Sequence, residues 1–230
     1  MAQMDHLSAL AATRLGVLAE IGWLSRQPTD FQSLVARLGR WRSLDAGETI
    51  YHAGDEPEGL FGLAEGILEI TFPLISDEPV VVHRAEPGFW IGDTAILTDQ
   101  KRIITVSAAT RARVFVIPAS SVRRIVEDDP RYWRSFYEQC VTNQETTLML
   151  LAEALSLSPR ARIARILLRL ALPDGSVPGN QEDLGRLLGM ARSSVRRALS
   201  SLIEIGAVTS GYGTIAIRDR TILEKLVREA

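Results

Sequence analysis

The chain has 230 residues, of which 46% are hydrophobic; this is enough for a substantial core and predicts two domains. No apolar run reaches the ~18 residues that a membrane-spanning helix needs, and the N-terminus lacks the layout of a secretory signal. The single cysteine, Cys140, excludes an intramolecular disulfide and any all-cysteine metal or iron–sulfur cluster within one chain, which fits a cytoplasmic protein.

The N-terminal segment predicts two helices. Four leucines fall partly on one face of the first: Leu7, Leu10, Leu15 and Leu18. The second is expected over residues 31–39, with Asp30 or Thr29 as its N-cap. No motif assigns a function to the first twenty residues.

From Trp41 the sequence changes to short β-type runs separated by glycine and proline turns. The runs expected to be strands are residues 49–51, 60–63, 67–72, 80–83, 103–107 and 114–117. Leu68 and Ile70 alternate with Glu69 and Thr71, which is typical of a half-buried strand. Many short strands with regular turns indicate a sandwich or barrel, and a closed jelly roll is the simplest such fold. Pro118 ends this region.

After a short helix over residues 119–127, the longest predicted helix runs from Arg131 to about Leu157. It carries two apolar stripes. One is expected to pack on the β domain: Tyr137, Val141, Leu148, Leu151 and Leu155. The other has the 3–4 spacing of a two-stranded coiled coil and is the predicted dimer interface: Trp133, Phe136, Cys140, Asn143, Thr147, Leu150 and Ala154. The alternative is that both stripes are buried within one monomer. Ser158 then caps a further helix and is the expected domain boundary.

Residues 180–205 predict a helix-turn-helix. Residues 181–188 form the first helix, Gly189 and Met190 the turn, and the second helix begins near Arg192. One side of the second helix is apolar, with Val195, Ala198, Leu199 and Leu202. The opposite side presents Arg192, Ser193, Arg196, Arg197 and Ser200. A solvated basic face on an ordinary helical hairpin is the alternative.

Two further features favour DNA. Residues 206–218 predict a β-hairpin that forms a wing beside the second helix. From residue 157 onward there are 12 Lys and Arg against 7 Asp and Glu, net +5, whereas residues 1–156 carry net −7. A basic C-terminal third is the electrostatic signature of a protein that binds the phosphate backbone.

Four stretches, in this order, resemble the cyclic-AMP receptor protein/fumarate-nitrate regulator (CRP/FNR) family: residues 44–70, 87–97, 161–171 and 181–199. The resemblance implies an α+β fold with a cyclic-nucleotide-binding-type β jelly roll in residues 1–130. A dimerisation helix is implied in residues 131–157 and a winged helix-turn-helix in residues 158–230. It further implies a homodimer on a palindromic operator, a small-molecule effector inside each β domain, and a contact with RNA polymerase.

This sequence matches only some residues of the family's effector loop. Gly92 matches and Thr94 follows, but Asp93 replaces the family's glutamate, and Ile103 replaces a Ser or Thr. Arg102 stands at the arginine position, where a charge-assisted phosphate contact is feasible. Thr147 matches a ligand-contacting threonine of the long helix. The two replacements disfavour cyclic AMP and leave a different small ligand, or no ligand, as the alternatives.

The family's DNA-reading residues transfer better. Arg192 and Arg197 match its two arginines, which suit bidentate contact with guanine or phosphate. Ser193 replaces a glutamate and Arg196 a small residue, so the expected half-site differs from TGTGA and TTGAT. Gln181 and Ser194 are expected to contact phosphate by position.

The sequence therefore predicts a cytoplasmic, DNA-binding transcription regulator and no enzyme. A cyclic-nucleotide-binding module without a DNA function is the alternative. Cys140 is interpreted as a small buried residue rather than a redox thiol.

Overall fold

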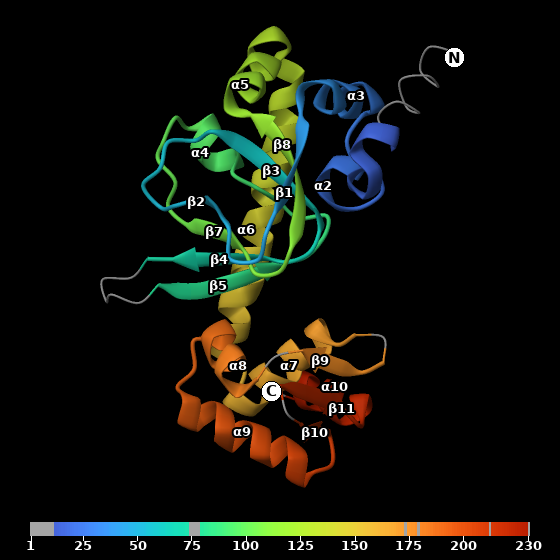
Figure 1. The fold of residues 1–230 in the computed structure, drawn as a ribbon, viewed down its shortest axis with the longest axis vertical. Coiled ribbons are helices and arrows are strands. Elements are labelled where there is room, and N and C mark those ends of the chain that lie inside the picture. The colour runs from blue at the N-terminus through green and yellow to red at the C-terminus, as the bar shows by residue number, and fades with distance from the viewer. Residues whose placement is uncertain (1–11, 74–78, 173, 179, 212, 230) are drawn as a thin grey trace. The chain divides into compact units, whose positions relative to one another are not determined.

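The computed structural model describes residues 12–73, 79–172, 174–178, 180–211 and 213–229 (Figure 1). The chain divides into two units. Residues 1–79 and 83–146 form a β domain with flanking helices, and residues 147–230 together with 80–82 form the second unit. The mixed helix and sheet content confirms the α+β prediction. No helix among the described residues has both the length and the apolar character needed to cross a bilayer.

The N-terminal segment folds as short pieces rather than one helix. A 3₁₀ turn η1 (Gly16–Ala19) and α2 (Gly22–Ser25) precede α3 (Thr29–Leu38). Positive φ at Gly16 and Gly22 breaks the predicted amphipathic helix. Leu15 and Leu18 are fully buried, and Leu7 and Leu10 lie outside the described residues.

The predicted cap of α3 is wrong. Its N-cap is Pro28, because Thr29 and Asp30 are already helical. The Asp30 carboxylate accepts a hydrogen bond from the backbone amide of Phe31 instead.

Within the described residues, eight strands form two four-stranded sheets, which is the two-sheet arrangement of the predicted jelly roll. The first has the order β1 (Arg40–Leu44), β8 (Ala112–Pro118), β3 (Gly59–Glu65) and β6 (Trp90–Ile91). The second has the order β2 (Thr49–Tyr51), β7 (Thr105–Ala108), β4 (Leu68–Phe72) and β5 (Val80–Ala85). The six predicted strands are all present, and β1, β6 and the short helix α4 (Asp93–Leu97) were not predicted.

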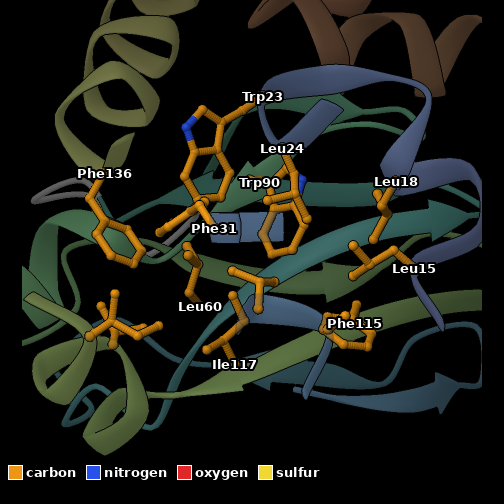
Figure 2. Close-up of a cluster of buried hydrophobic side chains, with 14 of the residues drawn as sticks. Leu15, Leu18, Trp23, Leu24, Phe31, Leu60, Trp90, Phe115, Ile117 and Phe136 are labelled. Atoms are coloured by element: carbon orange, nitrogen blue, oxygen red, sulfur yellow. The ribbon is translucent and has the colours of Figure 1, made fainter. Parts of the chain in front are cut away.

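Between and beside the sheets lie two apolar clusters. In β4, Leu68 and Ile70 are buried opposite Ala108 and Val106 of β7, which confirms the predicted alternation. The other cluster, called the aromatic cluster here because it includes Trp23, Phe31, Trp90, Phe115 and Phe136 among its aliphatic residues, joins the N-terminal segment to the β domain (Figure 2). In it, the rings of Trp23 and Phe31 meet Phe136 at centroid distances of 5.9 and 5.3 Å.

The long helix α6 (Trp133–Ser156) follows α5 (Ala119–Asp128) and a 3₁₀ turn, η2 (Pro130–Tyr132). The stripe predicted at the dimer interface is buried at Phe136 but exposed at Trp133, Thr147 and Ala154. Phe136 is fully buried in the aromatic cluster, and Asn143 donates to the Trp90 carbonyl, so these two residues pack within their own chain rather than at a surface. The stripe expected to pack on the β domain is exposed: Tyr137 at 68%, Leu148 at 56%, Leu151 at 52% and Leu155 at 80%.

The second unit contains α7 (Pro159–Leu170), α8 (Gln181–Leu188), α9 (Arg192–Glu204) and α10 (Arg220–Arg228). Ser158 caps α7 by accepting from the Ala161 amide at 3.3 Å, with proline at the first helical position, as predicted. The predicted hairpin is β10 (Val208–Ser210) with β11 (Thr214–Ile217), and a third strand, β9 (Ser176–Pro178), pairs with β11. The core of this unit includes Ile163, Leu167, Leu199 and Leu202.

Candidate nucleic-acid interface and effector loop

Helices α8 and α9 have the bounds that the sequence predicts, and local contacts fix the turn between them. Gly189 has φ +56, a conformation that glycine adopts readily, and the Met190 amide donates to the Gly185 carbonyl at 3.0 Å. The Arg162 guanidinium of α7 donates to the Leu188 carbonyl at the end of α8. The first helix is thereby tied to the core helix of its unit.

Helix α9 is divided into a buried and an exposed face. Val195, Ala198, Leu199 and Leu202 are at most 7% exposed and lie in the core of the unit. Arg192, Ser193, Arg196, Arg197 and Ser200 are all exposed, and Ser194 is half-buried. The predicted division is confirmed. Three guanidiniums and two hydroxyls thus form one surface that the core holds rigidly, which is the arrangement that base and phosphate contacts require.

The start of α9 adds backbone donors to this surface. Its N-cap is Ala191, whose side chain cannot accept a hydrogen bond, and no side-chain cap is present. The first turn of a helix leaves amide groups unpaired and carries a partial positive charge, so it favours an anion. The neighbouring α8 differs, because Asn180 Oδ1 caps it by accepting from the amides of Glu182 and Asp183.

A pocket of about 440 Å³ joins the two helices to the hairpin. Gln181 and Arg192 line it together with Ser210 and Thr214, at the end of β10 and the start of β11. The structure thus brings Gln181 to the same place as the first arginine of α9. Sequence reasoning missed the two hydroxyls, although their positions in the predicted wing would have indicated them.

The effector loop lies between β6 and α4. Gly92 has φ +108 and caps α4. A Cβ there would lie 2.8 Å from Arg102 Nη1 and 2.9 Å from the Gly59 carbonyl oxygen, so glycine is required both for its backbone conformation and for space. Thr94 is exposed on the first turn of α4.

Arg102 is almost fully buried, at 4% exposed, and points inward. Nη1 donates to the Gly92 carbonyl at 2.8 Å and Nη2 to the Gly59 carbonyl at 2.6 Å. The guanidinium carbon lies 4.2 Å from the centre of the Tyr51 ring. Burial lowers the pKa of Arg102. Its two terminal nitrogens are therefore committed to backbone carbonyls.

Asp93 is also buried, at 2% exposed, and faces α6. Its Oδ1 accepts from Asn143 Nδ2 at 3.2 Å. Burial raises the pKa of Asp93, although hydrogen bonds from Cys140 and Asn143 oppose the rise. Burial and the nearby Asp93 charge raise the pKa of the Cys140 thiol to about 12.

The remaining two candidates are exposed. Ile103 is 70% exposed, and Thr147 is exposed and belongs to the second unit. The structure therefore brings together Gly92, Asp93 and Arg102, but uses the charged groups internally. A cyclic nucleotide needs a guanidinium for its phosphate and a carboxylate for its ribose. Arg102 Nη1 and Nη2 and Asp93 Oδ1 are hydrogen-bonded within the chain, whereas Arg102 Nε and Asp93 Oδ2 are buried without a partner among the described residues. With isoleucine in place of a hydroxyl at position 103, these residues match only part of a cyclic-nucleotide site.

Each of the two units matches a known domain family. Residues 41–129 match the cyclic nucleotide-binding domain family, and residues 161–226 match the Crp-like helix-turn-helix domain family. The chain is 26% identical over 179 residues to the cAMP-activated global transcriptional regulator Vfr of Pseudomonas aeruginosa, covering 73% of this chain and 84% of that protein. It is 22% identical over 239 residues to the CRP-like cAMP-activated global transcriptional regulator of Mycobacterium tuberculosis, covering 99% and 100%.

Solved structures show the same fold. A CRP/FNR-family transcriptional regulator of Thermus thermophilus matches with a TM-score of 0.70 at 21% identity, covering 82% of this chain and 98% of that one. FixK2 of Bradyrhizobium japonicum matches with a TM-score of 0.68 at 20% identity, covering 82% and 96%.

Proposed function

The chain belongs to the CRP/FNR family of DNA-binding transcription regulators, and we propose that it reads a palindromic operator as a homodimer, with α9 of each protomer in a major groove. The observation that carries this proposal is the exposed guanidinium surface of α9, held by a fully packed opposite face.

Most polar residues of this surface and its surroundings have a proposed role. Arg192 and Arg197 contact guanine O6 and N7, or the adjacent phosphates. Ser193 accepts from a cytosine amine more weakly than the charged carboxylate of a glutamate would, and Arg196 adds a contact, so the half-site differs from TGTGA and TTGAT. Gln181, Ser194, Ser210 and Thr214 contact phosphates and set the register.

We assign the dimer interface to the exposed stripe of α6, defined here as Tyr137, Val141, Gln144, Leu148, Leu151 and Leu155. These positions follow one another at spacings of 4, 3, 4, 3 and 4, the heptad repeat of a two-stranded coiled coil. Trp133, 45% exposed, extends the stripe by one turn. The exposed apolar side chains support this choice over the stripe that contains Phe136, Cys140 and Asn143.

Other parts of the proposal follow from the role of a regulator. The protein acts in the cytoplasm, contacts RNA polymerase at its promoters, and catalyses no reaction. A small-molecule effector controls the arrangement of the two units, with Ser158 as the hinge before α7. Such an effector works by binding one arrangement more tightly than the other.

The test is selection of binding sites from random duplexes, followed by affinity measurement on the selected operator. Arg192→Ala with Arg197→Ala is expected to weaken specific binding about 100-fold or more, because each bidentate guanine contact contributes about 1–3 kcal/mol. The control is Arg220→Ala with Arg228→Ala on α10, which removes the same charge from exposed positions of the same unit.

The control pair is expected to retain most of the affinity. Unchanged operator affinity in the α9 variant would show that this helix does not read DNA. Recovery of an unmodified TGTGA palindrome would refute the proposed role of Ser193 and Arg196.

A further inference from the structure

A second pocket lies in the β-domain unit, between the N-terminal segment and α6. Its volume is about 340 Å³, a size that takes a small metabolite. Its lining comes from three segments: residues 20–26, residues 88–90, and Gln139, Thr142 and Asn143 of α6. None of the six residues expected to bind an effector lines it.

Gln139, one of the residues that line this pocket, carries a buried hydrogen-bond acceptor without a partner in the described part of the chain. Gln139 is 1% exposed, and its Nε2 donates to the Trp90 carbonyl at 2.7 Å, which fixes the orientation of the amide. Its Oε1 accepts no hydrogen bond from the described residues. A buried acceptor left unpaired is costly, so a ligand that donates to it gains more than the same contact would give in water.

The pocket is also lined by a positively charged side chain, that of Arg26. Arg26 is exposed, and its Nη2 donates to Thr142 Oγ1 at 3.3 Å. Among the described residues no ion pair occupies it, and the carboxylate of Glu138 on α6 accepts from Gln27 and Arg134 instead. The planar guanidinium therefore retains donors for the two oxygens of a carboxylate.

Apolar side chains form one part of the wall, and Glu20, Ser25 and Asn143 are its other polar side chains. Ile21, which is 38% exposed, lines the pocket together with Phe89 and Trp23. Gly22 and Gly88 meet here so closely that a Cβ on Gly22 would lie 2.0 Å from the Gly88 carbonyl oxygen. This contact fixes the N-terminal side of the pocket against the loop before β6.

We propose that this pocket binds a small apolar carboxylic acid that also carries a hydroxyl or amine donor. The carboxylate pairs with Arg26, the donor reaches Gln139 Oε1, and the apolar body lies against Ile21 and Phe89. The occupant contacts the N-terminal segment and α6 at once, next to the hydrogen bond that Trp23 Nε1 donates to the Ser135 carbonyl at 2.7 Å. This site goes beyond the function proposed above, since binding here requires neither DNA nor dimerisation.

The test uses the indole ¹H–¹⁵N signals of the four tryptophans in the full-length protein. The probes are 4-hydroxybenzoate, benzoate, which lacks the donor, and 4-hydroxybenzamide, which lacks the charge. We expect 4-hydroxybenzoate to shift the Trp23 signal saturably while leaving the signal of Trp133, which does not line the pocket, unchanged. Each of the other two probes is expected to bind about tenfold more weakly, the effect of losing one well-placed charged or buried contact.

Arg26→Met is expected to abolish the preference for 4-hydroxybenzoate over its amide. The matched control is Arg124→Met on α5, an exposed arginine outside the pocket, which leaves that preference intact. The comparison of 4-hydroxybenzoate with benzoate probes Gln139 without a substitution that could unfold the domain. Failure of all three probes to shift Trp23 up to their solubility limits, or equal shifts in wild type and Arg26→Met, would overturn the proposal.

Discussion

The side-chain amide of Asn143, on α6, donates a hydrogen bond to Oδ1 of Asp93, at the start of α4, over 3.2 Å. The same amide nitrogen lies 3.2 Å from the Trp90 carbonyl oxygen. One residue of the long helix therefore holds both sides of Gly92, the glycine that the family resemblance assigns to the effector loop. Movement of this loop and movement of α6 are mechanically coupled at this point.

Asp93→Asn is expected to change how stability depends on pH. Burial raises the pKa of Asp93 in the folded protein above its ordinary value of 3.8, so the folded state binds the proton more tightly than the unfolded state. Wild-type stability should then fall as pH rises from the ordinary to the raised pKa, by about 1.4 kcal/mol for each unit between them.

The asparagine variant cannot ionise at this position and retains an acceptor for Asn143. Urea unfolding between pH 4 and pH 8 should show the variant gaining stability relative to wild type as pH rises. If the free energy of unfolding depends on pH in the same way in wild type and variant, the pKa of Asp93 is the same in the folded and the unfolded protein.

Arg102→Met should act on stability rather than on nucleotide affinity. The variant leaves the carbonyls of Gly59 and Gly92 without their donors, at a cost of about 2–4 kcal/mol in the free energy of unfolding. Lys101→Met, an exposed neighbour, is the control and should be neutral.

In calorimetric titration, we expect no micromolar binding of cyclic AMP or cyclic GMP to wild type. Micromolar binding that Arg102→Met abolishes would show that the guanidinium leaves these carbonyls to take a phosphate.

Cys140 should be chemically inert in the folded protein. With the thiol pKa at about 12, the thiolate fraction at neutral pH is about a thousandfold below that of an ordinary cysteine. Reaction with a thiol-specific disulfide reagent should be correspondingly slow, and it should reach the normal rate when the protein is unfolded in urea. Peroxide treatment should leave operator affinity unchanged. Rapid labelling of the native protein would instead identify Cys140 as an accessible thiol.

Leu151→Lys with Leu155→Lys should convert the dimer to monomer in sedimentation experiments, because both positions lie in the exposed stripe of α6. Met149→Lys with Ser156→Lys adds the same charge to exposed positions outside the stripe, one heptad apart, and should leave the dimer intact. Both variants should fold, since none of these side chains is buried. A monomeric control and a dimeric test variant would place the interface on another face.

The DNA-binding unit could be predicted closely because its signals are local. A glycine turn, an apolar face at helical spacing and a following hairpin determine α8, α9 and the wing without reference to distant residues. Strands β1 and β6 lack such signals. In β1 only Leu44 is buried, and β6 has two residues. Both depend on pairing with the central strands β8 and β3.

The two stripes of α6 could not be distinguished from spacing, because both are apolar. Which stripe is buried depends on Trp23 and Phe31, because their rings contact Phe136. Both residues lie in the N-terminal segment, far from Phe136 in the sequence. For the effector loop, the sequence pointed to Arg102 by its position in the family's pattern. It could not indicate that two backbone carbonyls would occupy its guanidinium.

The packing of the N-terminal segment also determines when the β domain can finish folding during synthesis. Trp23 and Gln27 hydrogen-bond to Ser135 and Glu138, 112 and 111 positions later in the chain. Ribosomes add about 5–20 residues per second. Ser135 and Glu138 are therefore synthesised on the order of ten seconds after Trp23 and Gln27. During that interval the indole of Trp23 has no α6 to cover it. We therefore expect the nascent chain to recruit a chaperone until residue 138 has left the ribosome, and a chain truncated before α6 to aggregate.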